Sequence, residues 1–500
     1  MLLAAAIRLC GAFFDLPYIY HPDEPFNINI AERMYATGNL RPAAFDYPGL
    51  FYYLNLAAAH SYLGVLRFFG GHADAVQPID AQVMGSAFAP SVQLTVLFRW
   101  VTVVFGVLTV AGTFIAGRVA RDERAGLIAA VLIAVCPLAV GQSRFVTPDI
   151  FVTAFGVFAL AGACGIATKG SWKTYFLTAA CLAAATACKP NGILLATCLP
   201  VACALDPSRV SRKLARCLAA AVFGLLVFFV ATPYTVLEVS AALRRFSEQL
   251  SSYGSGGHAG MDAGGPFWYA RELWTQMTLA FPLAVIQMIR SVRSRRAPEI
   301  VVTATTLVYL LIVSLFAVKN GRSALPVVPA LCILAACATV DIVNWIRNSS
   351  ESTVGQQLKT IAPPFIALCL VTSPLLADVR QIVSIRTVDS RTTSREWIER
   401  NIPPRSTIAV ESYSPYLDGN AFHLVRLERA IDQPPAWYVA NGVEYVVLSE
   451  GMYRRYLEHA DQYPWEAAAY RRLAASFVEK KHFVDGGYSV YLYKVEPPPG

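Results

Sequence analysis

The chain has 500 residues, of which 15% are charged and 55% are hydrophobic, and its mean hydropathy is +0.45. A soluble domain carries about 25% charged residues, so this composition excludes an ordinary soluble protein. The formal net charge of +8 does not indicate nucleic-acid binding, because the basic residues gather in short gaps between apolar segments. We therefore predict a polytopic α-helical membrane protein that contacts membrane lipids and no nucleic acid.

Apolar segments recur along the chain at the length that crosses about 30 Å of hydrocarbon. The first follows Met1 directly, and we interpret it as a retained span, because Arg8 interrupts the run where a cleavable signal peptide would be apolar. We expect eleven spans, at residues 1–19, 99–117, 125–142, 149–168, 174–188, 191–205, 215–232, 272–289, 299–318, 323–344 and 360–377.

The first loop, residues 20–97, contains two amphipathic segments. "EPFNINIAERMYATG" (24–38) has apolar residues at helical spacing, and Gly38 can end the helix. The segment 47–70 is rich in tyrosine and phenylalanine, which favour the membrane interface. We predict two interfacial helices in this loop.

Basic residues alternate between the gaps, as the positive-inside rule predicts for cytoplasmic loops. The basic gaps contain Arg118, Arg121 and Arg124; Lys169 and Lys173; Arg209, Arg212, Lys213 and Arg216; and Arg290, Arg293, Arg295 and Arg296. This alternation puts residues 20–97, 143–148, 233–271 and the tail from Asp378 outside the cell membrane. We expect a multi-pass protein of the inner membrane.

The tail, residues 378–500, is more polar and reads as a separate extracytoplasmic α/β domain after a membrane module at 1–377. "STIAVES", "VEYVVLS" and "YSVYLYKV" predict strands, and "SREWIERNIP" predicts a helix with Ser394 as its N-cap. All eleven cysteines precede this tail, and their spacing is not that of a metal site.

Ionisable residues at the outer ends of spans are functional candidates, because a charge at membrane depth is costly. Asp23 and Glu24 follow the first span, Arg144 and Asp149 flank Pro148, and Lys189 interrupts two apolar runs. A structural interpretation stays open for each. The acids are also suited to helix starts, and the basic side chains can extend to lipid headgroups.

The order of these motifs resembles the GT-C superfamily of polyprenyl-phosphate-sugar-dependent glycosyltransferases, which includes relatives of protein O-mannosyltransferases and lipid A aminoarabinose transferases. The resemblance covers nearly the whole chain. It rests on the Asp-Glu pair and on "AERMYATGNLRP", "DYPGLFYYL", "SRFVTPDIF", "CKPNG", "GRSALPVVPALCILAA" and "DSRTTSREWIERNIPPRSTIAVES".

The resemblance implies a role for each matching residue. Asp23 matches the catalytic acid with Glu24 beside it, and Asp149 matches a second acid on the acceptor side. Lys189 matches a residue at the donor phosphate, where we also expect Arg144, Arg322 and Tyr47.

One motif departs from the family pattern. Aminoarabinose transferases have Lys-Pro-Pro where this chain has Tyr47-Pro48-Gly49, so a phosphate contact by that lysine is lost. Asp46 keeps an acid there. No cofactor is required, and a divalent cation held by Asp46, His21 and His258 stays an alternative.

The expected function is therefore inverting transfer of a sugar from a polyprenyl-phosphate carrier to a hydroxyl of a lipid, glycan or protein on the periplasmic face. A carboxylate takes the proton of the acceptor hydroxyl and cations hold the departing phosphate. Because this is one displacement, the anomeric configuration inverts. The alternative is a polytopic transporter or flippase of lipid-linked substrates, which would show paired, interrupted spans in two halves.

Overall fold

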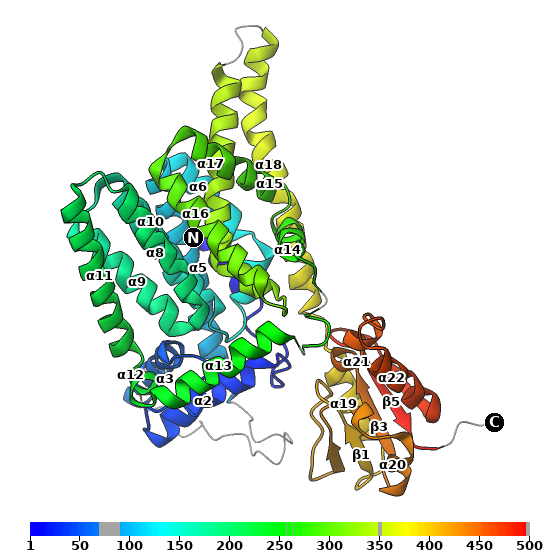
Figure 1. Ribbon diagram of the computed structural model, residues 1–500. Coiled ribbons are helices and arrows are strands. Elements are labelled where there is room, and N and C mark those ends of the chain that lie inside the picture. The colour runs from blue at the N-terminus through cyan, green and yellow to red at the C-terminus, as the bar shows by residue number, and fades with distance from the viewer. Residues whose placement is uncertain (70–90, 257, 263, 349–352, 497–500) are drawn as a thin grey trace.

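The computed structural model describes residues 1–69, 91–256, 258–262, 264–348 and 353–496. It consists of a helical bundle and an α/β unit that follows the long helix α18 (Figure 1). The bundle comprises α5 (Val92–Ala120), α6 (Glu123–Ala134), α7 (Pro137–Gln142), α8 (Asp149–Lys169), α9 (Trp172–Cys188), α10 (Cys198–Leu205), α11 (Val210–Ala231), α15 (Ala280–Ser294), α16 (Ala297–Leu315), α17 (Val328–Asn348) and α18 (Thr353–Ser384).

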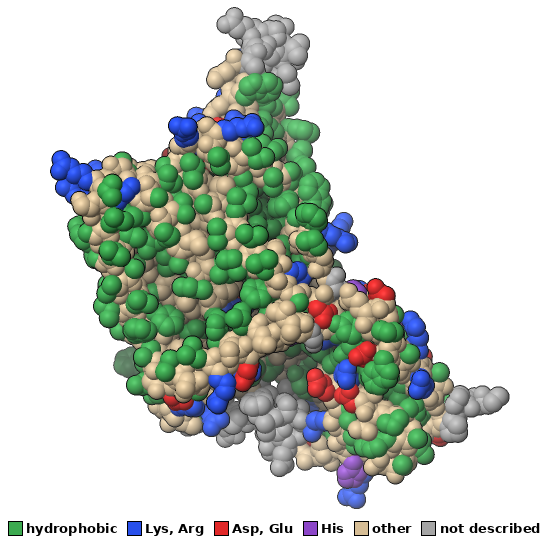
Figure 2. Space-filling model, viewed as in Figure 1, with side chains coloured by type: hydrophobic (Ala, Val, Ile, Leu, Met, Phe, Trp, Pro, Cys, Tyr) green, Lys and Arg blue, Asp and Glu red, His purple; other side chains and the backbone are tan. Residues whose placement is uncertain are grey.

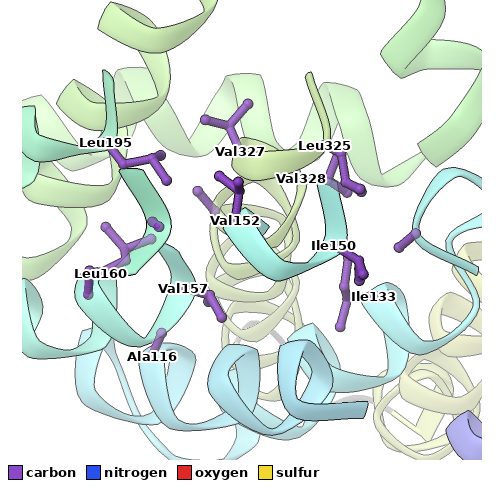
Figure 3. Packing of buried hydrophobic residues seen from close by; sticks show 14 of the residues in the cluster. Ala116, Ile133, Ile150, Val152, Val157, Leu160, Leu195, Leu325, Val327 and Val328 are labelled. Atoms are coloured by element: carbon purple, nitrogen blue, oxygen red, sulfur yellow. The ribbon is translucent and has the colours of Figure 1, made fainter. Parts of the chain in front are cut away.

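Helix α8 lies at the centre of the bundle. It packs against α5, α9, α10 and α16, and 78% of its most apolar 18-residue stretch is buried inside the protein. A helix that is apolar on all sides needs such surroundings. Figure 3 shows Ile150, Val152 and Val157 of α8 among Ile133, Leu195 and Leu325.

The outer helices of the bundle keep their apolar faces uncovered. Only 6% of the most apolar 18-residue stretch of α11, and 11% of the corresponding stretch of α18, is buried inside the protein. Exposed leucine, valine and phenylalanine along these helices are suited to hydrocarbon and not to water. The chain is a multi-pass membrane protein.

Among the described residues, six helices are long and apolar enough to cross a membrane. They are Val92–Ala120, Asp149–Lys169, Val210–Ala231, Ala297–Leu315, Gly321–Asn348 and Lys359–Ser384. The expected first span is not a continuous helix, because α1 covers only Leu2–Leu9 before the chain turns. The expected span 125–142 is divided into α6 and α7 at Pro137, which lacks the N–H that a helix interior needs.

Most of the shorter helices gather at the end of the bundle that is lower in Figure 1, whereas α14 lies higher, next to α15. The two helices predicted in the first loop are present as α2 and α3, and Gly38 ends α2 in the left-handed conformation. The short helices are α2 (Asp23–Thr37), α3 (Leu50–Phe68), α12 (Pro233–Leu237), α13 (Val239–Ser255) and α14 (Trp268–Met277), and two 3₁₀ segments precede α10 and α17, namely η2 (Pro190–Thr197) and η3 (Gly321–Val327).

The α/β unit has a five-stranded sheet in the order β2-β1-β3-β5-β4. β1 is parallel to β2 and β3, whereas β5 is antiparallel to β3 and β4. The strands are β1 (Thr407–Val410), β2 (His423–Arg426), β3 (Tyr445–Ser449), β4 (Val478–Phe483) and β5 (Val490–Lys494); the helices are α19 (Ser390–Asn401), α20 (Pro435–Ala440), α21 (Glu450–Leu457) and α22 (Pro464–Ser476), with the turn η4 (Ala430–Asp432).

Two details of this unit differ from the sequence prediction. Helix α18 continues through Asp378 to Ser384, so the polar unit starts later than residue 378. The N-cap of α19 is Asp389, whose carboxylate accepts the Arg391 N–H, and Ser394 lies inside the helix. An ionised carboxylate at the N-cap satisfies a free N–H and also meets the positive end of the helix dipole.

The α/β unit contacts the bundle next to α2. The Tyr416 hydroxyl donates to the Ile19 carbonyl at 3.1 Å, and the Tyr416 and Tyr20 rings stack with centroids 5.5 Å apart. The Tyr20 hydroxyl lies 3.0 Å from that of Thr392. Farther along the chain, the Tyr463 hydroxyl donates to Asp262 at 2.5 Å. The unit is therefore attached both before α2 and after α13.

Candidate active site

Asp23 is the first residue of α2, at the end of the bundle that faces the α/β unit. Its backbone N–H donates to His21 Nδ1 at 3.2 Å, and its carboxylate forms an ion pair with Arg322 in η3. Both side chains are partly exposed, Asp23 by 31% and Arg322 by 21%. Burial raises the pKa of Asp23, but the charge and hydrogen bond of Arg322 outweigh burial and hold the pKa below its usual value. Asp23 is therefore an ionised carboxylate that a solute can approach.

Glu24, the neighbouring acid, is completely buried. Arg99 of α5 binds it with two hydrogen bonds, Nε to Oε1 at 2.9 Å and Nη2 to Oε2 at 2.8 Å. The Val146 N–H also donates to Glu24 Oε1 at 2.9 Å. A carboxylate enclosed in this way cannot meet an acceptor hydroxyl. The prediction groups Glu24 with Asp23, with Asp23 as the base and Glu24 as its support, and this enclosed geometry suits the supporting position.

Asp149 begins α8 and is also buried. Its Oδ1 accepts a hydrogen bond from Lys189 Nζ at 2.7 Å. Its Oδ2 is buried and has no partner among the described residues. Lys189 immediately precedes η2 and keeps 16% of its side chain exposed. An acid and a base from distant motifs thus form an ion pair, which sequence analysis did not predict.

The backbone of one residue, Val146, connects the two acidic positions. The Val146 N–H donates to Glu24, and the Val146 carbonyl accepts from Asn27 Nδ2 at 2.9 Å. Val146 precedes Asp149 by three residues in the same turn. The start of α8 is therefore fixed to the start of α2, and Asp149 to the helix that carries Asp23.

The two 3₁₀ segments bring Lys189, which directly precedes η2, and Arg322 of η3 to the same region of the protein. Asn191 of η2 donates to the Tyr309 hydroxyl at 2.9 Å, which in turn donates to the Ser323 carbonyl of η3 at 2.9 Å. This bridge connects the segment after Lys189 with the segment that contains Arg322. A buried, fully used hydroxyl of this kind fixes the spacing of the chains it joins.

Lys189 and Arg322 line a cavity of about 230 Å³. Tyr47, which sequence analysis placed at the donor phosphate, lines it as well. The remainder of the wall is mostly apolar, with a few polar side chains. It consists of Asp46, Pro190, Asn191, Ile193, Leu194, Phe246, Gln249, Leu250, Tyr253, Tyr269, Ile312, Val313, Phe316, Val318 and Ser323. The cavity is therefore amphiphilic, with cations at one part of its wall and hydrocarbon over the rest.

Arg144 does not line this cavity, contrary to the sequence prediction. It is buried, and its Nη2 donates to the Ile7 carbonyl at 3.3 Å. Its side chain packs against Gly11 so closely that a Cβ at Gly11 would lie 2.6 Å from Arg144 Cδ. Although Arg144 is close to Asp149 in sequence, the turn directs its side chain toward α1. Arg144 therefore contacts the first helix and not the cavity.

The residues predicted as metal ligands do not fit a cation. Asp46 binds Arg245 Nη2 at 2.6 Å and accepts from Gln249, and His21 Nδ1 accepts the Asp23 N–H. His258 lies beside the Tyr253 ring, 5.9 Å between centroids. Among the described residues, no three His, Cys, Asp or Glu side chains gather as ligands of a metal ion would.

Arg99 is the residue of this site that sequence analysis missed. It lies inside an apolar helix, is completely buried, and donates to the carbonyls of Ala12 and Phe14 in addition to Glu24. A lone arginine in "TVLFRWVTVV" was the available signal, because such a charge in a span requires a partner.

Comparisons with known proteins agree with this architecture. A family model described as dolichyl-phosphate-mannose-protein mannosyltransferase matches residues 93–236. No curated protein sequence matches the chain.

Two solved structures are similar along nearly all of the chain. ArnT from Cupriavidus metallidurans bound to undecaprenyl phosphate has 14% identity and a TM-score of 0.57, over 100% of this chain and 99% of that one. The archaeal oligosaccharyltransferase AglB from Archaeoglobus fulgidus, in complex with an inhibitory peptide and a dolichol-phosphate, has 13% identity and a TM-score of 0.56, over 98% of this chain and 73% of that one. At these identities the likeness shows a shared fold.

Proposed function

We propose that this chain, which has the GT-C fold and crosses a membrane several times, is a glycosyltransferase that takes a sugar from a polyprenyl-phosphate carrier. The observation that carries the proposal is the amphiphilic cavity with Lys189 and Arg322 in its wall. A polyprenyl phosphate has the matching chemistry, an anion joined to a hydrocarbon chain. The similar ArnT and AglB structures contain undecaprenyl phosphate and dolichol-phosphate, which supports this donor class.

The donor phosphate binds between Lys189 and Arg322, and Tyr47 contacts it from the third side. Charge-assisted hydrogen bonds from two cations oppose the charge that develops as the carbon–oxygen bond to the phosphate breaks. The isoprenoid chain lies along Leu250, Ile312 and Phe316 in the apolar part of the cavity. Because the phosphate is a good leaving group, no covalent intermediate with the protein is needed.

Asp23 is the general base of the reaction. A hydroxyl of the acceptor attacks the anomeric carbon, its proton moves to the Asp23 carboxylate, and the polyprenyl phosphate leaves with the bonding electron pair. The attack occurs opposite the leaving group, so the anomeric configuration inverts. Base catalysis of this kind contributes about 10²–10⁴ in rate. Glu24 and Arg99 position the turn that carries Asp23, and Asp149 holds Lys189.

The reaction takes place on the extracytoplasmic face of the inner membrane. Lys and Arg side chains gather at the end of the bundle away from the α/β unit (Figure 2). The positive-inside rule assigns that end to the cytoplasm. The α/β unit and Asp23 then lie outside, with α2 and α3 at the interface.

Binding of undecaprenyl phosphate to the full-length protein in detergent tests the proposal. Lys189→Ala removes a charge-assisted contact worth on the order of 1.5–3 kcal/mol, which weakens binding roughly 10- to 100-fold. Arg41→Ala is the matched control, because Arg41 is also ion-paired, with Glu238, but does not line the cavity. Equal affinity in the wild type and Lys189→Ala would contradict the proposed donor site.

A further inference from the structure

A second cavity, of about 500 Å³, lies between the bundle and the α/β unit. Pro22, Pro25 and Phe26 from the start of α2 form one wall. The opposite wall comes from residues 410–417 and from Leu424, Arg426 and Leu427. Its volume is within the range of about 300–1,000 Å³ that small-molecule sites have. It shares no lining residue with the first cavity.

The far wall of this second cavity is the end of a parallel strand pair. β1 ends at Val410 and β2 at Arg426, and the two strands run parallel with Val410 opposite Arg426. Open sheets with parallel strands bind ligands beyond the carboxyl ends of those strands. The location is thus one at which the sheet can present side chains and backbone to a ligand.

The lining has an unpaired positive charge. Arg426 is exposed and forms no ion pair with any residue that the structure describes. Glu411, the acid in the wall, already accepts hydrogen bonds from the Ala430 and Ser449 N–H groups and from Tyr470. Arg391 is occupied by Asp389 through two hydrogen bonds. The charge available to a ligand is therefore that of Arg426, and it selects an anion.

The remaining surface offers a hydroxyl and rings. Ser414 Oγ is buried and has no hydrogen-bond partner in the described part of the chain. Phe26 is 40% exposed, and the Tyr416 ring is half-buried. Sugars have hydroxyls that can pair with such an oxygen and C–H faces that can pack on rings. This combination indicates a carbohydrate and not an inorganic ion alone.

Asp23 lies where the two cavities approach each other. Its neighbour Pro22 and Phe26, one turn later, line the second cavity, whereas its carboxylate pairs with Arg322 of the first. A hydroxyl presented from the second cavity and a sugar held in the first would meet at this carboxylate.

We infer that the second cavity is the acceptor site and that the acceptor is an anionic carbohydrate, a sugar with a phosphate or carboxylate group that binds Arg426. This inference rests on the proposed function, because it assigns the second substrate of the same reaction. The acceptor hydroxyl gives its proton to Asp23 as described above.

Ligand-observed NMR on the full-length protein in detergent tests the inference with glucose 6-phosphate, glucose and inorganic phosphate as probes. We expect glucose 6-phosphate to bind at least tenfold more tightly than either glucose or phosphate. Arg426→Glu should abolish this preference, and Arg426→Lys should retain most of it. Lys480→Glu is the matched control, an exposed basic residue on β4, the opposite edge strand of the sheet.

Three results would overturn the inference: glucose 6-phosphate binds no better than glucose, inorganic phosphate binds as well as the sugar phosphate, or the preference persists in Arg426→Glu. A site that prefers an extended peptide along β2 would give the first result. Undecaprenyl phosphate is titrated into the same samples. Loss of its binding in Lys189→Ala supports the donor site whatever the sugar phosphate does, so the two proposals fail separately.

Discussion

Arg322 forms an ion pair with Asp23, although 299 residues separate them, and it also lines the cavity assigned to the donor. Under the proposed function this guanidinium interacts with two anions, the Asp23 carboxylate and the donor phosphate. When the phosphate takes part of this cation, Asp23 loses stabilisation of its charged form, and its pKa rises. The base is therefore strengthened when the donor arrives.

The pH dependence of transfer should reflect this exchange. The pKa of free Asp23 is lowered, so its carboxylate stays charged as the pH falls and is protonated only below that pKa. In the donor complex the pKa is higher, and protonation begins at a higher pH. With donor varied at saturating acceptor, we expect the acidic limb of kcat to lie at higher pH than that of kcat/KM. Coincident limbs would contradict the exchange.

Substitution of the two adjacent acids separates their roles. Asp23→Asn keeps size and polarity but cannot accept the proton, so turnover should fall by about 10²–10⁴ while undecaprenyl phosphate still binds. Glu24→Gln leaves Arg99 with an uncompensated buried charge, so the unfolding temperature should fall more than in Asp23→Asn. Transfer rate and unfolding temperature are measured on the same preparations. Near-normal turnover of Asp23→Asn beside a stable, inactive Glu24→Gln would reverse the assignment.

A second charge cluster lies at the opposite end of the bundle. Glu299 is completely buried and accepts hydrogen bonds from Arg121 at 2.6 Å and Gln287 at 2.7 Å. Glu299→Gln should destabilise the protein by roughly 1–3 kcal/mol, because Arg121 loses a charged partner and keeps Asp341. Thermal unfolding measures the change. Glu396→Gln, which breaks the exposed pair with Arg400, should cost less than about 1 kcal/mol.

Cysteine labelling in intact cells tests the orientation. Ala475 in α22 and Ser294 at the end of α15 are both exposed, on opposite ends of the protein. An impermeant thiol reagent should label Ala475→Cys and leave Ser294→Cys unlabelled until the membrane is opened. Wild type is the control for the native cysteines, of which Cys10 is exposed. Labelling of Ser294→Cys in intact cells would contradict the proposed orientation and indicate the opposite one.

Sequence reasoning identified the shared fold, because the lengths of apolar segments and the order of motifs can be read directly from the chain. Of the cavity wall it named only Asp46, Tyr47, Lys189 and Arg322, and the apolar lining was not predicted. It found Asp23, Asp149, Lys189 and Arg322, which the fold brings together in two ion pairs.

The sequence could not predict the directions in which the side chains point. Arg144 and Asp149 share one turn, yet only Asp149 faces the lysine, because the direction of each depends on packing against α1 and η2. β2 and β4 were also missed. Their polar residues lie on the two edges of the sheet, where alternation is weak.

The attachment of the α/β unit has a consequence for protein engineering. Its residues Arg391, Thr392 and Tyr416 hold Ile19 and Tyr20, which precede Asp23 by only a few positions. A chimera that exchanges this unit between proteins of the same fold would therefore also have to exchange the segment before α2. Otherwise the foreign unit would pull the chain at Tyr20 into a different path and displace Asp23 from Arg322. The α/β unit therefore cannot be exchanged alone. The exchanged part must include the segment around Ile19 and Tyr20, which lies nearly four hundred residues upstream of Tyr416.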